Sequence, residues 1–62
     1  MRQLIKDIMG RHIGTIEDRG GIKVALDCMG RKLGEYHKKN NKTYDVIGRI
    51  KSVGDTLANF IY

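Results

Sequence analysis

The stretch that decides the fold is Asp7-Ile8-Met9-Gly10-Arg11-His12-Ile13-Gly14-Thr15-Ile16. It returns as Asp27-Cys28-Met29-Gly30-Arg31-Lys32-Leu33-Gly34-Glu35-Tyr36, and its first half restarts as Asp45-Val46-Ile47-Gly48-Arg49. The copies are 20 and then 18 residues apart. A repeated unit in so short a chain gives information about the fold and little about an active site.

Each copy begins with the chemistry of a tight turn. An aspartate at the first turn position accepts backbone N–H bonds, and a glycine three residues later adopts the left-handed conformation that closes a hairpin. Asp18-Arg19-Gly20-Gly21 and Asn40-Asn41 mark two further turns. Turn signals therefore fall near residues 7–10, 18–21, 27–30, 38–42 and 45–48. Such regular spacing is typical of a meander of short strands.

Strands are expected between these turns, over residues 2–6, 11–17, 22–26, 31–37, 43–45 and 49–53. Gly14 and Gly34 lie at equivalent positions inside two of them. A glycine inside a strand indicates a bulge, a sharp bend or the close approach of another segment. This favours a strongly coiled sheet or a small barrel. Ser52 stands at the same position of the third copy, so the internal symmetry is not expected to be exact.

The C-terminus changes period. Leu57, Phe60 and Ile61 are spaced like one face of a helix, and Asp55 is a suitable N-cap. We expect a short helix over 55–61 that plugs one end of the sheet or docks on a neighbouring subunit, with a seventh edge strand as the alternative. The predicted fold class is all-β: a small antiparallel meander of about six short strands with a short C-terminal helix, in a single domain over residues 1–62.

Length and composition set further bounds. A 62-residue chain buries little apolar surface, and a single cysteine forms no internal disulfide, so homo-oligomerisation is expected. No apolar run reaches the ~18 residues of a membrane span, and the N-terminus has no signal-peptide core. We therefore expect a cytoplasmic protein without a membrane partner. His12, His37 and Cys28 lack the paired spacing of a zinc site, so neither a metal nor a cofactor is expected.

The formal net charge of +5 favours anionic partners. The segment His37-Lys38-Lys39-Asn40-Asn41-Lys42 is the densest basic stretch, and Tyr36 and Tyr44 flank it. Lysines beside aromatic rings suit phosphate contacts and base stacking. The alternative interpretation is a solvated hairpin tip whose lysines discourage aggregation.

The turn arginines Arg11, Arg31 and Arg49 occupy equivalent positions. They could grip phosphates as a ladder of guanidinium groups. The alternative is that each pairs with its own turn aspartate: Asp7 with Arg11, Asp27 with Arg31, and Asp45 with Arg49. Met9, Met29 and Ile47 are also equivalent, and we interpret them as core positions beneath the turns.

The Asp-x-x-Gly-Arg-x-[Ile/Leu]-Gly unit resembles the hairpins of small orphan β-repeat proteins from phages and other mobile elements, among them the four-fold β-flower proteins. The resemblance spans roughly residues 7–58 and is carried by turn chemistry. It implies a small β fold and a phage origin, and it carries over no catalytic residue.

The leading hypothesis is a non-enzymatic, homo-oligomeric binding module for a phosphate-bearing ligand, either nucleic acid or a nucleotide-type signal molecule. Its expected ligand-binding residues are Lys38, Lys39, Lys42, Arg31, Arg49, Tyr36 and Tyr44. The alternative is a protein–protein inhibitor or adaptor, such as a phage anti-defence protein. It would act through a sheet edge or through an apolar tail formed by Leu57, Phe60, Ile61 and Tyr62. An enzyme relying on Cys28 or His12 is a third, weaker hypothesis.

Overall fold

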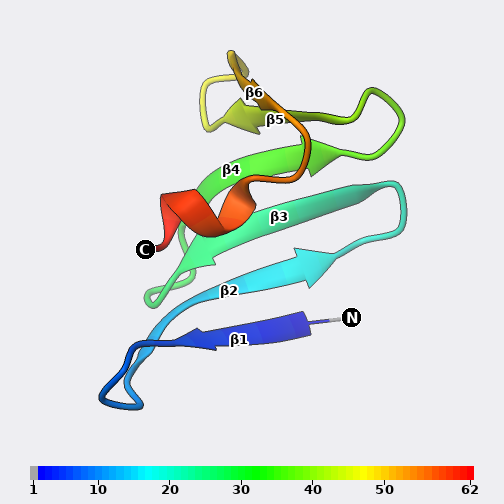
Figure 1. The fold of residues 1–62 in the computed structure, drawn as a ribbon. Helices are drawn as coiled ribbons and strands as arrows, with labels where there is room; N and C mark the ends of the chain where they lie inside the picture. The colour runs from blue at the N-terminus through cyan, green and yellow to red at the C-terminus, as the bar shows by residue number, and fades with distance from the viewer. Residues whose placement is uncertain (1) are drawn as a thin grey trace.

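The computed structural model describes residues 2–62 and shows one antiparallel sheet of six strands in chain order (Figure 1). The strands are β1 (Arg2–Lys6), β2 (His12–Asp18), β3 (Ile22–Asp27), β4 (Lys32–His37), β5 (Lys42–Asp45) and β6 (Ile50–Val53). Each lies within one or two residues of its predicted range. The all-β meander is therefore confirmed. The sheet is open, because β1 and β6 are its two edges, so it is coiled but does not close into a barrel.

The three repeat hairpins have the same register. Ile5 lies opposite Gly14, Ala25 opposite Gly34, and Thr43 opposite Ser52. Directly after each of these pairs the register shifts, which leaves one extra residue on the second strand. That bulge position is occupied by Ile13, Leu33 and Lys51 in turn. The third hairpin thus keeps the backbone pattern of the first two, although its sequence departs from theirs.

The turn aspartates close the three hairpins as predicted. Oδ1 of Asp27 accepts N–H bonds from Met29 and Arg31 at 2.9 and 2.8 Å, and its backbone oxygen accepts from Gly30 at 3.0 Å. Asp7 and Asp45 make the same three bonds in their own turns. The glycines that follow have φ between 84° and 90°, a conformation that side-chain-bearing residues seldom adopt.

The C-terminal segment folds over one face of the sheet, across β3 and β4 (Figure 1). A 3-10 helix, η1 (Leu57–Phe60), replaces the predicted helix over 55–61. It covers a face instead of plugging an end. Thr56 occupies the N-cap but its side chain makes no capping bond, whereas Asp55, the predicted cap, accepts the Leu57 N–H at 3.3 Å. Asp55 also pairs with Lys23 at 3.0 Å.

Close approach explains the two interior glycines. A Cβ on Gly14 would lie 2.8 Å from Ile61, and one on Gly34 would lie 2.8 Å from the Phe60 ring. The core between sheet and tail contains Ile5, Ala25 and the fully buried Leu57. Thr43 is also fully buried, and its hydroxyl donates to the Gly54 carbonyl at 2.6 Å.

Met9, Met29 and Ile47 are not core residues, which corrects the prediction. Their exposed fractions are 77%, 78% and 68%. They lie at the hairpin tips, beyond the reach of η1, because the turn projects past the end of the sheet. Within residues 2–62, no helix has both the length and the apolar character to cross a membrane.

Candidate ligand-binding cleft

The five basic residues among the predicted ligand-binding residues fall into two groups at opposite ends of the sheet. Lys38 and Lys39 lie in the turn after β4, and Lys42 begins β5. Arg31 precedes β4, while Arg49 lies in the β5–β6 turn at the same end. The six residues of β4 separate the two groups by about 20 Å, at roughly 3.3 Å per strand residue. One small ligand therefore does not bridge them.

The two tyrosines do not form one stacking platform. Tyr36 lies opposite Thr43, and Tyr44 is the next residue along β5, so alternation places the two rings on opposite faces. The Tyr36 hydroxyl donates to Asn41 at 2.7 Å, and the Asn40 amide donates to the Tyr44 hydroxyl at 3.3 Å. The Tyr44 ring also lies 4.6 Å from that of His37.

Several predicted cations already have carboxylate partners. The Lys38 ammonium contacts both oxygens of Asp18 at 3.0 and 3.1 Å, and this bond lowers the pKa of Asp18 below 3.8. Arg31 donates to Asp27 at 2.9 Å, and Arg11 donates to Asp7 at 2.9 Å. The self-paired interpretation is thus confirmed for two hairpins.

The third turn differs. Asp45 accepts only backbone N–H bonds, and the Arg49 side chain has no ion-pair partner among residues 2–62. In the first two turns, N–H bonds from the arginine lower the pKa of Asp7 and of Asp27, and the backbone N–H of the arginine contributes most.

The apolar tail is largely used within the chain. Leu57 is fully buried, and Phe60 and Ile61 are half-buried against Gly34 and Gly14. Leu57 is therefore wrong as an interface residue, because its side chain has no exposed surface to offer a partner. Tyr62, at 75% exposed, is the most accessible of the four predicted tail residues.

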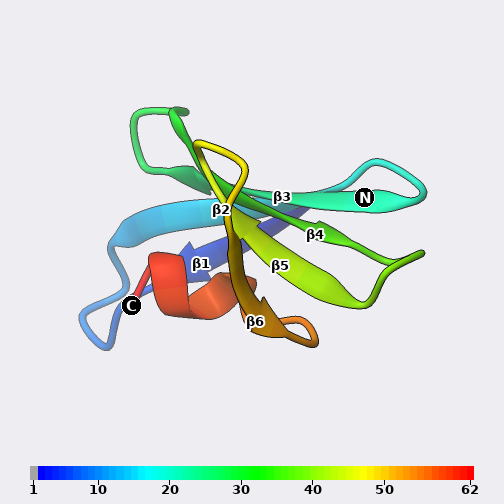
Figure 2. The same ribbon diagram turned by 90° about the horizontal axis from the view of Figure 1, so that it is seen from above.

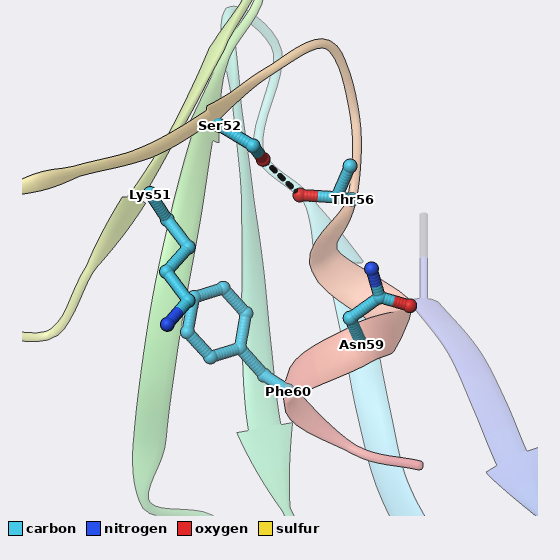
Figure 3. A pocket seen from close by; sticks show the side chains of 5 residues that line it. All are labelled: Lys51, Ser52, Thr56, Asn59 and Phe60. Atoms are coloured by element: carbon cyan, nitrogen blue, oxygen red, sulfur yellow. Dashed lines mark hydrogen bonds between the residues drawn. The ribbon is translucent and has the colours of Figure 1, made fainter.

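A cleft of about 180 Å³ opens between β6 and η1 (Figure 3). Its lining residues come from three adjacent segments: Lys51 and Ser52 from β6, Thr56 from the connection, and Asn59 and Phe60 from η1. Ser52 and Thr56 hydrogen-bond through their hydroxyls at 2.5 Å. The cleft is lined by a cation, an aromatic ring, two hydroxyls and an amide, and no carboxylate from residues 2–62 lines it.

The cleft lies where the third hairpin departs from the repeat. Lys51 occupies the bulge position that Ile13 and Leu33 fill in the other hairpins, and Ser52 replaces the glycine. Tail side chains cover Gly14 and Gly34, whereas the hydroxyl of Ser52 faces an open hollow. The third hairpin thus has Lys51 and Ser52 where the other two have an apolar residue and a glycine. No tail side chain packs on Ser52 as Ile61 and Phe60 pack on the two glycines.

Sequence reasoning missed this site, although the signal was present. The mismatch at Ser52 marks it, and the lysine beside it becomes informative once the bulge aligns Lys51 with Ile13 and Leu33. Phe60 and Asn59 carry no repeat signal, because the tail lies outside the repeat.

Across residues 2–62, the structure assembles no group of three or more His, Cys, Asp or Glu side chains that could hold a metal ion. Comparison with protein-family models, with curated protein sequences and with solved structures finds no match for this chain.

Proposed function

We propose that the protein is a non-enzymatic binding module for a small phosphate-bearing ligand of nucleotide type, held in the cleft between β6 and η1. The observation that carries the proposal is the composition of that cleft. An ammonium group and an aromatic ring line the same hollow, together with three neutral hydrogen-bonding side chains and no acid. A ligand that carries both a planar ring and a negatively charged phosphate matches this combination.

Each lining residue has a distinct part in this proposal. The Lys51 ammonium has no ion-pair partner among residues 2–62, so its charge is available to a phosphate oxygen. The Phe60 ring, packed on Gly34 by one edge, offers a surface for stacking. The side chains of Ser52, Thr56 and Asn59 can donate hydrogen bonds to ring or sugar atoms of the ligand and can accept hydrogen bonds from them.

The size of the cleft limits the ligand. Pockets that enclose drug-sized molecules usually measure roughly 300–1,000 Å³. A hollow of about 180 Å³ accommodates one ring or one phosphate, with the rest of the ligand in solvent. This favours a mononucleotide over a long nucleic acid. The lysines of the β4–β5 turn then contribute general positive charge and no direct contact.

The test is isothermal titration calorimetry of the full chain with nucleoside monophosphates, the matching nucleosides and inorganic phosphate. We expect a monophosphate to bind more tightly than its nucleoside. Lys51→Gln should weaken monophosphate binding about 10-fold or more, because a charge-assisted hydrogen bond is worth roughly 1.5–3 kcal/mol.

The matched control is Lys39→Gln, which removes the same charge from an exposed turn outside the cleft. It should leave the affinity nearly unchanged. Equal losses in the two variants would show that only net charge matters, and would exclude the cleft as the site. Native mass spectrometry of the same samples reports the number of subunits and any retained nucleotide.

A further inference from the structure

All three repeat turns carry exposed apolar side chains, and Ile8, Met29 and Met9 are the most exposed large apolar residues within residues 2–62. Their tips are the pairs Ile8–Met9, Cys28–Met29 and Val46–Ile47. Ile8 is fully exposed. Val46 is the least exposed of the isoleucine, methionine and valine residues in these pairs, and it is still 57% exposed. Cys28 is exposed as well. The same feature thus occurs three times, on three separate hairpins.

All three tips lie at the same end of the sheet. Figures 1 and 2 show them on the side away from the β2–β3 and β4–β5 turns. Neighbouring tips are two strands apart, which corresponds to about 10 Å at the usual strand spacing. The tips therefore form a curved row along the end of the coiled sheet, and the tail, which covers the sheet face, leaves them uncovered.

The turns hold these side chains rigidly in solvent. Each tip is closed by three hydrogen bonds to its aspartate and by a glycine of positive φ. The central positions of such turns are usually polar, because they project into water. Exposed apolar groups of this kind mark a contact surface.

Positive charge lies directly behind each apolar pair. The arginine that follows each turn glycine is exposed, with 78% of the Arg11 side chain and 80% of the Arg31 side chain accessible. Both use Nε for the turn aspartate, so their terminal nitrogens remain available. Arg49 has no ion-pair partner within residues 2–62. Each turn also holds one aspartate, so the three turns are formally neutral, but the side chains of Asp7 and Asp27 are only 21% and 20% exposed. The row therefore presents apolar tips and exposed guanidinium groups, with the carboxylates turned inward.

We propose that this hairpin-tip row, formed by residues 8–9, 28–29 and 46–47 with Arg11, Arg31 and Arg49, docks the protein on an anionic lipid surface. Apolar side chains entering the headgroup boundary, backed by cations that meet anionic headgroups, are the pattern of interfacial binding. Three separate convex tips suit a deformable lipid surface better than a protein, which would need three matching hollows. Binding at the lipid surface needs no spanning segment, so the lack of one does not count against this proposal.

The experiment uses the full chain and vesicles of phosphatidylcholine, with or without 30% phosphatidylserine by composition. Cys28, the single cysteine, lies on the middle tip and accepts an environment-sensitive NBD label. We expect co-sedimentation with the anionic vesicles, a blue shift of the label, and weaker binding at high salt. The variant Met9→Ser/Met29→Ser/Ile47→Ser should lose at least 10-fold in partitioning.

The matched control is Val53→Ser, which removes an apolar side chain of similar exposure from β6, outside the row. It should bind like the wild type. Unchanged thermal unfolding of the triple variant shows that it is folded. The proposal is overturned if the anionic vesicles are not bound, if the label keeps its aqueous emission in the bound state, or if the triple variant binds normally. Tip-dependent self-association without vesicle binding would assign the row to a second copy instead.

Discussion

The first two hairpins and the third share a backbone but not a role. In the β1–β2 and β3–β4 hairpins, a glycine admits a tail side chain and the turn arginine bonds to its aspartate. In the β5–β6 hairpin, Ser52 and Lys51 line a cleft, and Arg49 bonds to Asp45 through its backbone N–H and not through its guanidinium group. The backbone bonds of the turn are therefore enough to keep the strand register of the third hairpin. Its strand side chains are not needed for that purpose, which leaves them available for binding.

The largest expected effect comes from filling the space that the tail occupies. Gly34→Ala would bring a methyl group within 2.8 Å of both the Phe60 ring and the Tyr44 backbone carbonyl. The ring can shift, but the carbonyl belongs to the sheet. We expect a loss of about 2–3 kcal/mol in the free energy of unfolding, in the upper part of the range for overpacked cores, measured by urea denaturation.

The control is a substitution to alanine at the equivalent position of the third hairpin. Ser52→Ala keeps the Cβ that this position already has and removes only the hydroxyl bond to Thr56. Its cost should be near 1 kcal/mol. If Gly34→Ala proved no more destabilising than Ser52→Ala, the tail would not be packed on the glycines as described.

The second test concerns the arginine side-chain bond that only the first two turns make. The N–H bonds from Arg11 and Arg31 hold the pKa of Asp7 and of Asp27 below 3.8 in the folded chain. A lowered folded-state pKa contributes stability above pH 3.8, and this contribution is lost as the pH falls through the folded value. We expect the melting temperature to drop on acidification from about pH 5 towards pH 2.

The Asp7→Asn/Asp27→Asn variant should show a shallower drop over that range, because its amides do not titrate, while their oxygens can still accept the backbone bonds. Differential scanning fluorimetry at constant ionic strength measures both proteins. Parallel curves for the two would show that other carboxylates control the acid response, with Glu17 and Asp18 the next to test, since both also have a lowered pKa.

The fold was predictable because its determinants are local. Each Asp-x-x-Gly segment specifies a turn through bonds within five residues, so the strand ranges between turns follow from the sequence. The tail was less predictable. Its 3-10 helix depends on Leu57 filling a site over β3 and β4, and this long-range contact leaves no periodic signal in so short a segment.

The candidate site was predictable only in part, for a similar reason. Clustering in sequence made the lysines of the β4–β5 turn conspicuous, but strand length separates them from Arg31 and Arg49. The exposure of Met9 and Met29 was missed because apolar residues in a repeat resemble core positions. Whether a tip is covered depends on where the tail ends, and the repeat contains no information on that.

The smallest expected effect on stability separates binding from folding in the third hairpin. Lys51→Leu places there the residue type that Leu33 provides at the bulge of the second hairpin. Because Lys51 is exposed and has no ion-pair partner among residues 2–62, we expect the free energy of unfolding to change by less than about 0.5 kcal/mol. Monophosphate binding should nevertheless be lost, since Lys51, the one cation of residues 2–62 that lines the cleft, is removed. A large loss of stability would mean that Lys51 supports the fold. Unaltered binding would place the ligand elsewhere, and the third hairpin would then differ from the others in sequence alone.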